Sequence, residues 1–460
     1  MLSSEAVTHQ LAAINGQHAL IIGLAREGVD LARFLSAHGA QVTVTDVKTP
    51  EALAESVAAL DGTSLTFHLG GHATTDVDGA DVVYASPGVP PDNVLLNHAR
   101  ERGVRVSSLV ELFFALCPAP ILGITGSAGK STTTSLLGEM FQAAGREAFV
   151  GGNIGRPLLG KLENMTERSW VVMELSSFQL EPLQASPHIA LITNVTPNHL
   201  DRHPSMEAYW AAKGQILAHQ RPSDWAVLNA DDEWSLRYRP LARTLRFSLQ
   251  GVVEGAYVAH AGGQEHVMLL GEPLLPTSEI PLRGRHNVAN VLAAVAAAHA
   301  ADLPREAMLA AIQSFNGVAH RLQTVAQRNG VTYVDDSIAT APERSIAALR
   351  AYEREPLVLI AGGRDKHLPM REWAELIARR VKHVVLLGEM SQLVADALNA
   401  VAPQYNAVTW ASSMDDAVKQ ACDIALAGDV VLLSPGGTSY DMYQDFEERG
   451  RDFARAVHSL

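Results

Sequence analysis

Cysteine is scarce in this 460-residue chain, which contains only Cys117 and Cys422. Two thiols so far apart in the sequence provide neither a disulfide framework nor the ligand spacing of a zinc site. Small disulfide-stabilised and zinc-binding folds are therefore excluded, and we expect both cysteines to pack as small apolar side chains. So few cysteines also fit a reducing compartment, and we expect the protein in the cytoplasm.

The sequence also lacks long apolar runs and an excess of basic residues. No stretch has the length that crossing a bilayer requires, and the segment MLSSEAVTHQLAAING has neither the basic nor the apolar part of a signal peptide. The 36 Lys and Arg against 50 Asp and Glu give a formal net charge of −14. Because nucleic-acid binding depends on clustered Lys and Arg, we expect neither a nucleic-acid partner nor membrane insertion.

What the chain does contain is a large hydrophobic fraction, 47% of its residues, with 19% charged. This composition predicts a folded protein of several domains. Strand patterns alternate with helical ones along the whole length, which is typical of mainly parallel α/β sheets. We predict three α/β domains in series: a Rossmann-like domain over residues 1–118, a central P-loop-type domain over 119–319 and a second Rossmann-like domain over 320–460.

The segment from Ile121 to Thr134, ILGITGSAGKSTTT, carries the clearest chemical signal. A glycine-rich turn lets backbone N–H groups face phosphate oxygens, a lysine neutralises the terminal phosphates and a hydroxyl ligates Mg²⁺. The usual spacing, G-x-x-x-x-G-K-[ST], needs glycine where this chain has Ile124, so the loop is a P-loop variant. It predicts ATP binding, with contacts from Gly126, Ser127, Gly129, Lys130, Ser131 and Thr132.

The first region predicts a nucleotide-binding βαβ unit. An apolar strand runs into the turn Gly23-Leu-Ala-Arg26-Glu-Gly28, and the next strand ends at Asp46. A further strand, 81–85, ends in Ser86-Pro87-Gly88, at the edge where open parallel sheets bind ligands. Ala25 occupies the middle glycine position of the G-x-G-x-x-G pattern, so a Rossmann-like fold without a ligand of its own is the alternative.

Glu174 and His199 of the second region are candidates for metal binding. Glu174 follows the predicted strand 170–173, where a P-loop domain places a second Mg²⁺ ligand; a helix cap or salt bridge is the alternative. His199 lies in a loop with Asn194, Asn198, Asp201 and Arg202 after the predicted strand 189–193, either as a ligand or as a hydrogen-bonded structural residue. Lys213 lies in a predicted helix, where the pattern alone favours a surface lysine.

Two later positions are candidates for nucleotide contacts. His286 and Asn290 share one face of an alanine-rich helix, and Asn287 is turned away from that face. Asn287 is either the N-cap of this helix or, with Asn290, a contact to adenine or ribose. Arg321 lies at a predicted hinge, either as an ordinary exposed residue or as an arginine that reaches the phosphates when the domains close.

The ordered set of these motifs resembles the Mur ligase family over essentially the whole chain. Each motif alone is weak, but their order is specific, and Glu174-Leu-Ser-Ser-Phe-Gln-Leu180 resembles the glutamate-adding member. The set comprises the phosphate loop, Gly152-Asn153-Ile154-Gly155, the Glu174–Leu180 motif, Asn194-Val-Thr-Pro-Asn-His199-Leu-Asp201, Lys213, His286-Asn287-x-x-Asn290, His320-Arg321 and Asp336-Ser337.

The resemblance implies a three-domain enzyme of peptidoglycan synthesis. The N-terminal domain would bind uridine diphosphate, the central domain MgATP, and the C-terminal domain the incoming amino acid. The implied reaction phosphorylates the carboxylate of UDP-N-acetylmuramoyl-L-alanine, and the amine of D-glutamate then attacks the acyl phosphate. Catalysis of this kind rests on positioning and charge neutralisation. We expect a monomer with these small-molecule partners.

The resemblance also implies roles for single residues. Two Mg²⁺ ions would be bound through Ser131, Glu174, His199 and Lys213, with Lys213 carbamylated by CO₂ into an oxygen ligand. The implied catalytic residues are Lys130, Glu174, His199, Lys213 and Arg321. Further nucleotide contacts would come from Asn287, Asn290, Arg321 and Asp336. The other substrates would be bound by Arg26, Asp46, Ser86, Gly88, Asn153, Ser176, Lys366, Ser439 and Phe446.

Two positions depart from the family pattern. Ala128 stands where the family usually has asparagine, so one side-chain contact to phosphate is lost. Ile338 stands in Asp-Ser-Ile-Ala-Thr where the family has lysine near the amino-acid carboxylate. Arg344, Arg364 or Lys366 would have to compensate for that lysine, and addition of L-glutamate stays open.

Two other classes of function are the alternatives to this one. A folylpolyglutamate synthase or a Mur ligase with another substrate would share the chemistry, but the folate enzyme lacks the N-terminal unit. An NAD-binding oxidoreductase or a P-loop switch protein is the alternative from another class. Ala25 weakens the dinucleotide pattern, and the sequence carries no redox motif in a second domain.

Overall fold

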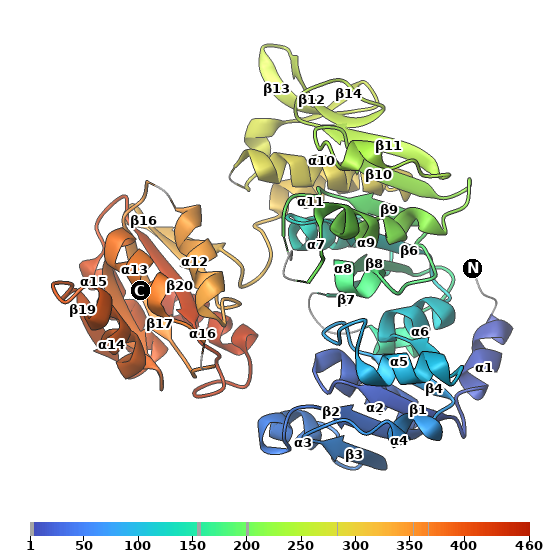
Figure 1. Cartoon of the computed structure of the whole chain (residues 1–460). Helices are drawn as coiled ribbons and strands as arrows, with labels where there is room; N and C mark the ends of the chain where they lie inside the picture. The colour runs from blue at the N-terminus through green and yellow to red at the C-terminus, as the bar shows by residue number, and fades with distance from the viewer. Residues whose placement is uncertain (1–3, 154–157, 199–201, 283, 353, 367) are drawn as a thin grey trace. The chain divides into compact units, whose positions relative to one another are not determined.

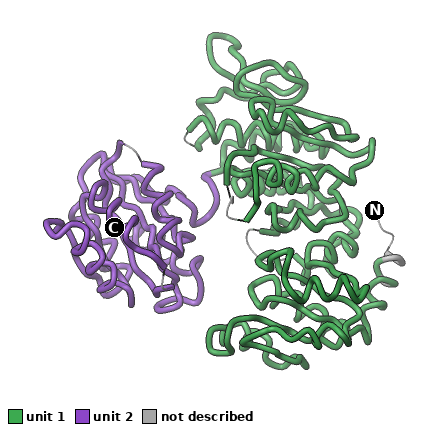
Figure 2. The backbone as a smooth tube through the Cα atoms, viewed as in Figure 1, with its two compact units in different colours: residues 1–315 green, residues 316–460 purple. Residues whose placement is uncertain are grey.

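The computed structural model describes residues 4–153, 158–198, 202–282, 284–352, 354–366 and 368–460. The chain divides into two compact units, residues 1–315 and 316–460 (Figure 2). The first unit contains two β-sheets and the second contains one, so each predicted α/β region has its own sheet. The domain limits drawn from the sequence at 118/119 and 319/320 stay predictions.

The first sheet has five parallel strands in the order β3-β2-β1-β4-β5 (Figure 1). The strands are β1 His18–Ile22, β2 Gln41–Asp46, β3 Leu65–Leu69, β4 Val82–Ala85 and β5 Arg105–Ser107. The accompanying helices are α1 Ser4–Ala12, α2 Arg26–Ala37, α3 Ala54–Ala58, α4 Thr75–Asp78, α5 Val94–Glu101 and α6 Leu109–Leu116. The strand order reverses between β1 and β4, and open sheets bind ligands beside such a reversal.

The second sheet has nine strands in the order β14-β13-β12-β11-β10-β9-β6-β8-β7. The strands are β6 Ile121–Thr125, β7 Ala148–Gly152, β8 Trp170–Glu174, β9 Ile189–Ile192, β10 Trp225–Asn229, β11 Arg243–Ser248, β12 Gly255–Ala261, β13 Gln264–Leu269 and β14 Glu272–Pro276. Strands β6 to β12 pair in parallel, as predicted, whereas β12, β13 and β14 form an antiparallel meander that the prediction missed.

Buried apolar strands and small helical side chains build the core of this sheet. The helices are α7 Lys130–Ala143, α8 Ser177–Leu180, α9 Met206–Ala218, α10 Arg285–Ala300 and α11 Arg305–Ser314. Every residue of β6 is buried. Residues 290–298 of α10 are buried too, and most are alanine, which lets this helix lie close to its neighbours. Among the described residues, no helix is both long and apolar enough to cross a membrane.

The third sheet, in the second unit, has the order β15-β16-β20-β17-β18-β19 (Figure 1). The strands are β15 Gln323–Arg328, β16 Val331–Asp335, β17 Leu357–Gly362, β18 Val381–Leu387, β19 Val408–Ala411 and β20 Val430–Gly436. The helices are α12 Pro342–Ala351, α13 Arg371–Arg380, α14 Ser391–Val401, α15 Met414–Ile424 and α16 Phe446–His458. Only the edge pair β15–β16 is antiparallel among the pairs that the structure describes.

Candidate functional site

The phosphate loop follows β6 and ends where α7 begins at Lys130. Gly126 and Gly129 both have positive φ angles, 148° and 85°. A Cβ atom at Gly126 would lie 1.9 Å from Thr193 Oγ1, and one at Gly129 would lie 2.2 Å from Asn290 Oδ1. Both positions therefore need glycine, for their backbone conformation and for the lack of space. The crowding also shows that Asn290 lies directly against the loop.

The loop is fixed by the segment that follows β9. The N–H of Ser127 donates to Asn194 O at 2.9 Å, and Ser127 Oγ donates to Thr196 O at 2.9 Å. The amide of Asn194 contacts the backbone of Ala128 on both sides: Ala128 N–H donates to Asn194 Oδ1, and Asn194 Nδ2 donates to Ala128 O, each at 3.0 Å. Asn194 thus orders the loop position at which Ala128 has no polar side chain of its own.

Two lysines donate to one carbonyl oxygen of the loop. Lys130 Nζ lies 2.9 Å and Lys213 Nζ 2.8 Å from Gly126 O. Lys213 is only 1% exposed, so the surface position that its sequence pattern favoured is wrong. Burial, and next the charge of Lys130, lowers the pKa of Lys213 from 10.5 to about 6, against the opposing effect of Glu174. The side chain is therefore a neutral amine at neutral pH.

Ser131 and Glu174 form the oxygen-rich part of the site. Ser131 Oγ donates to Glu174 Oε2 at 2.8 Å, and Asn153 Nδ2 donates to Glu174 Oε1 at 2.8 Å. Glu174 is 2% exposed and Ser131 5%. A carboxylate and a hydroxyl this close are the hard oxygen donors that Mg²⁺ prefers. His199 lies outside the described residues, and in the described part of the chain no three His, Cys, Asp or Glu side chains gather as a metal site.

The candidate nucleotide residues of α10 differ in detail from the prediction. The helix begins at Arg285 with Gly284 as its N-cap, so the N-cap alternative for Asn287 is wrong. Asn290 Nδ2 donates to Asn287 Oδ1 at 3.0 Å, so Asn287 is not turned away from Asn290. Residues three apart on a helix are neighbours, and the two amides form one polar pair next to Gly129.

The substrate candidates of the first sheet lie at its carboxyl edge. Asp46 accepts hydrogen bonds from the N–H groups of Leu24 (2.8 Å) and Lys48 (2.9 Å), which fixes the turn after β1. Ser86 Oγ donates to Gly23 O at 3.0 Å. Asp46 and Ser86 therefore order the glycine turn from both neighbouring strands, at the reversal of strand order.

The first and second sheets meet through polar contacts near the same turns. Arg26 donates to Asn153 O at 3.1 Å, and Gln179 Nε2 donates to Glu27 Oε1 at 2.6 Å. Burial raises the pKa of Glu27. Ser176, a predicted substrate residue, forms a capping box with Gln179 at the start of α8. These contacts join the glycine turn to Asn153 and hence to Glu174.

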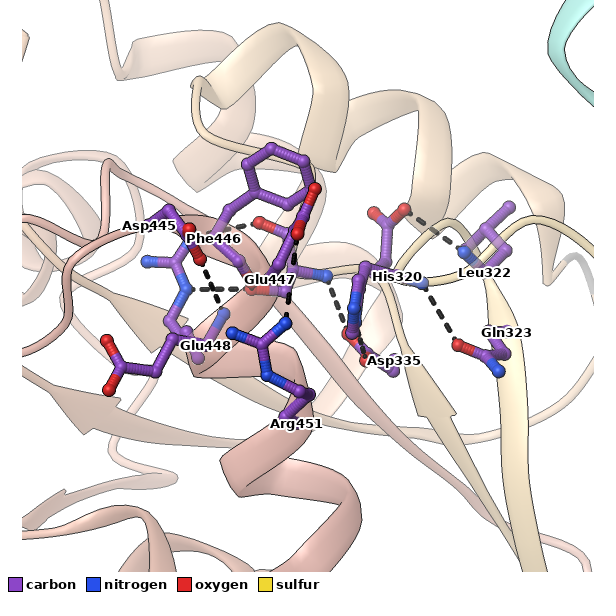
Figure 3. A network of polar contacts seen from close by, with 12 residues as sticks. His320, Leu322, Gln323, Asp335, Asp445, Phe446, Glu447, Glu448 and Arg451 are labelled. Carbon is purple, nitrogen blue, oxygen red and sulfur yellow. Dashed lines mark hydrogen bonds and ion pairs between the residues drawn. The ribbon is translucent and has the colours of Figure 1, made fainter. Parts of the chain in front are cut away.

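The second unit holds the remaining candidates, Arg321, Asp336, Lys366, Ser439 and Phe446. Figure 3 shows polar contacts around His320: His320 Nδ1 pairs with Asp335 Oδ2 at 2.7 Å, and the His320 N–H donates to Gln323 Oε1 at 3.0 Å. His320 has a φ of 61°, a left-handed conformation that is rare for a non-glycine residue. On the other side of Arg321, the Leu322 N–H donates to Asp336 Oδ1 at 3.2 Å, so side chains fix the backbone before and after Arg321.

Asp336 and Arg449 are buried next to this network. Burial raises the pKa of Asp336 to about 7, although Ser434 Oγ donates to its carboxylate at 2.8 Å. Arg449 is 3% exposed and donates to Ser337 Oγ and Ser337 O at 2.9 Å and to Gly437 O at 3.1 Å. Ser337 Oγ in turn donates to Phe446 O at 2.8 Å. Arg449 therefore joins the loops after β16 and β20 to the start of α16.

The cationic residues considered as replacements for a lysine at Ile338 lie in different surroundings. Arg344 Nη1 donates to Ile338 O at 3.2 Å. Arg364 forms a two-armed pair with Glu389, at 3.0 and 3.2 Å. Burial, and next the charges of Arg344 and Arg449, lowers the pKa of Lys366. Arg344 is the member of this set with a direct hydrogen bond to position 338.

Four residues at these sites had no contact of their own predicted from the sequence, although Asn194 and Arg202 were noted as neighbours of His199. Asn194, Tyr209 and Arg202 contact the loops of the first unit, and Arg449 those of the second. Asn194 follows a strand end and could have been found from that position. The other three face partners far away in the sequence, which no local pattern indicates.

Comparison with known proteins follows the same three regions. Residues 17–108 match the MurD-like N-terminal domain of Mur ligases, 124–298 the Mur ligase middle domain and 320–437 the glutamate ligase domain of Mur ligases. A solved structure with a similar fold is UDP-N-acetylmuramate–alanine ligase MurC from Thermotoga maritima, with a TM-score of 0.55 and 20% identity, covering 96% of this chain and 99% of that one. The solved structure supports the fold, and the three matches to Mur ligase domains, with the phosphate loop, define a three-domain ATP-dependent ligase.

Two relatives narrow the assignment. The UDP-N-acetylmuramoylalanine–D-glutamate ligase of Symbiobacterium thermophilum is 40% identical over 96% of this chain and 98% of its own length. The enzyme of the same name from Roseiflexus sp. is 42% identical, over 97% and 99%. The chain belongs to the Mur ligase family, within its group of UDP-N-acetylmuramoylalanine–D-glutamate ligases, and the resemblance seen in the motifs is confirmed.

Proposed function

We propose that this chain joins D-glutamate to UDP-N-acetylmuramoyl-L-alanine at the expense of ATP, in the synthesis of peptidoglycan precursors. The observation that carries the proposal is the phosphate loop with Lys130, held beside buried Lys213 and Glu174, in a chain whose relatives bear this activity in their names. The monomeric state and cytoplasmic location expected from the sequence stay predictions.

The reaction divides into two steps. A carboxylate is a poor electrophile, so its oxygen first attacks the γ-phosphorus of ATP, giving an acyl phosphate and ADP. The amine of glutamate then adds to the acyl carbon, and the tetrahedral adduct loses inorganic phosphate and a proton to leave the amide. Lys130 and the loop N–H groups would stabilise the charge that develops on the transferred phosphoryl group.

Magnesium has a fitting donor set in this chain. Ser131 and Glu174 would bind one ion, because their oxygens lie 2.8 Å apart in a buried position. His199 and Lys213 are proposed for a second ion. Bound Mg²⁺ would neutralise phosphate charge and orient the phosphates.

Carbamylation of Lys213 is part of this proposal. Only a neutral amine adds to CO₂, and the lowered pKa of about 6 keeps Lys213 neutral at neutral pH. The carbamate would be an oxygen ligand where the free amine is a poor one. Intact-mass measurement in bicarbonate should show the added mass, and short carboxylates should restore activity to Lys213→Ala. If no added mass and no rescue were found, Lys213 would not be carbamylated, and the proposed reaction would stand without this modification.

The remaining candidates are proposed as substrate contacts. Asn287 and Asn290 would contact the adenine, and Arg321 and Asp336 the phosphate and ribose. Arg26, Asp46, Ser86 and Gly88 lie at the ligand-binding edge of the first sheet and would bind the uridine diphosphate part, while Asn153 and Ser176 would meet the muramoyl part. The pocket for glutamate would be formed by Lys366, Ser439 and Phe446.

A coupled phosphate-release assay with UDP-N-acetylmuramoyl-L-alanine tests the proposed function. We expect release with D-glutamate and little with L-glutamate, D-alanine or diaminopimelate. Ile338, in the place of a family lysine, makes L-glutamate the second candidate substrate. Equal or faster turnover with L-glutamate would assign that stereoisomer, whereas no turnover with either glutamate would overturn the function.

A further inference from the structure

Arg202 connects the two sheets of the first unit. Its guanidinium donates to three consecutive backbone carbonyls: Nη1 to Gly88 O at 3.2 Å, and Nη2 to Pro87 O at 3.4 Å and Val89 O at 2.7 Å. These carbonyls belong to the turn after β4, which the proposed function places in the pocket for the UDP-linked substrate. Arg202 itself precedes α9, a helix of the domain that is built on the second sheet.

The other side of Arg202 rests on aromatic rings of the second sheet's domain. The guanidinium carbon lies 5.2 Å from the ring centroid of Phe178, a cation–π distance. Phe178 is stacked on His203, with centroids 5.3 Å apart and an interplanar angle of 8°. His203 is 2% exposed and its Nε2 lies 3.0 Å from Ser177 Oγ. The Phe178 ring of α8, held by its stacking on buried His203, therefore fixes the position of the Arg202 guanidinium.

The same contacts continue to the phosphate loop. The ring of His203 lies 5.2 Å from that of Tyr209. The hydroxyl of Tyr209 lies 3.1 Å from Ser127 Oγ, and its ring lies 4.5 Å from Lys213 Nζ. An unbroken series of van der Waals, stacking and hydrogen-bonding contacts thus runs from the turn after β4 through Arg202 to the phosphate loop.

We propose that Arg202 is a positioning residue, which holds the Pro87–Val89 turn in register with the phosphate loop so that the substrate carboxylate meets the γ-phosphate of ATP. The inference rests on the proposed function, because that function assigns ligands to the turn and the loop. A guanidinium is a rigid, planar fork that binds several oxygens and stacks on a ring at the same time, which an ammonium group cannot do. The three hydrogen bonds described for Arg202 go to backbone oxygens, so they fix where the turn lies.

Arg237 provides a matched control in the same unit. Its guanidinium carbon lies 3.9 Å from the Trp234 ring centroid, and it pairs with Glu233 at 2.8 Å. It therefore has a stacked ring and a hydrogen-bond partner, as Arg202 has, but both partners are its neighbours in sequence. Arg237→Met removes a stacked arginine without touching the contact between the sheets.

The test is steady-state kinetics with each substrate varied in turn. Arg202→Met should raise the KM for UDP-N-acetylmuramoyl-L-alanine about ten-fold or more, since it removes three charge-assisted hydrogen bonds. The KM for ATP should change by less than about two-fold, because the loop keeps its own contacts to Asn194. Arg202→Lys should fall between wild type and Arg202→Met, and Arg237→Met should match wild type.

A second variant separates positioning from folding. Phe178→Leu removes the ring beneath Arg202, keeps the carbonyl contacts and should raise the same KM by a smaller factor. The double variant should lose less than the two single effects predict, because the residues act together. Unchanged KM values, or a fall in kcat alone from loss of folded enzyme, would overturn the positioning role. A wild-type enzyme that releases no phosphate would instead overturn the proposed function.

Discussion

Lys213→Met should make the protein more stable and inactive at the same time. The unfolded chain holds this lysine protonated up to about its usual pKa of 10.5, whereas burial lowers the pKa to about 6 in the folded chain. Folding at neutral pH therefore requires the loss of a proton. Methionine has a similar length and no proton to lose, so the variant folds without that cost.

The size of the effect follows from the pKa values. One pKa unit is worth about 1.4 kcal/mol, so deprotonating a group of pKa 10.5 at about pH 7.5 costs about 4 kcal/mol. The hydrogen bond from Lys213 to Gly126 O returns about 1 kcal/mol. We expect Lys213→Met to raise the free energy of unfolding by about 3 kcal/mol at this pH.

The pH dependence has a definite sign. Between about pH 6 and 10.5 the unfolded state binds one more proton than the folded state, so the stability of the wild type rises with pH over this window. The free-energy cost of burying Lys213 has its full value below about pH 6 and is absent above 10.5. The advantage of Lys213→Met should therefore nearly disappear at about pH 9.5.

Urea unfolding of both proteins in CO₂-depleted buffer, at about pH 7.5 and 9.5, measures this difference. Lys161→Met is the control, because Lys161 is an exposed lysine of the same unit and its replacement should change little. A variant that is less stable than wild type at the lower pH, or a difference that does not shrink at the higher pH, would refute the reasoning. Phosphate release by Lys213→Met should be lost, and retained activity would contradict its role in the site.

Three further variants test the phosphate loop of the first unit and the candidate site of the second unit. Lys130→Ala should lower phosphate release about 100-fold or more while the chain stays folded, and retained activity would contradict the loop assignment. Gly129→Ala should weaken ATP binding at least about ten-fold in calorimetry, whereas Gly145→Ala, also at positive φ but with nothing within 4 Å, should bind normally. Asp336→Asn should stabilise the second unit by about 3 kcal/mol more at pH 8 than at pH 5. The reason is that the folded chain, in which the pKa of Asp336 is raised to about 7, holds a proton that the unfolded chain has lost, so the wild type loses stability as the pH rises towards 7. Equal effects at both pH values would show that the carboxyl ionises normally.

The sequence predicted best where function lies on one continuous segment. The glycine-rich turn predicted between Ile121 and Thr134 lies between β6 and the start of α7, because its pattern of apolar residues, glycines, lysine and hydroxyls is local. The antiparallel meander β12–β14 was missed, although Gly262-Gly263 between β12 and β13 is a hairpin signal that the prediction did not use. That miss lies outside the site.

Burial and long-range contacts were beyond the local pattern. Lys213 lies on α9, a helix with apolar residues on several sides, so its sequence does not tell which side faces the core. The contact of Asn194 with Ala128 joins residues 66 positions apart, and that of Arg202 with Val89 joins residues 113 apart. The pairing of β6 with β9 brings Ala128 and Asn194 together, whereas Arg202 and Val89 meet where the domains of the first and second sheets pack against each other. The position of His199 stays a prediction.

The carbonyl oxygen of Gly126 has a consequence for how phosphate is taken up. Lys130 already has this oxygen as an acceptor at 2.9 Å, and Lys213 shares it. When a nucleotide binds, Lys130 would therefore exchange the Gly126 carbonyl for a phosphate oxygen as its acceptor. The free energy gained is the difference between a hydrogen bond to a neutral carbonyl and one to a charged oxygen. Burial keeps the Lys213 nitrogen neutral at neutral pH, so Lys213 should add no salt dependence of its own to nucleotide affinity.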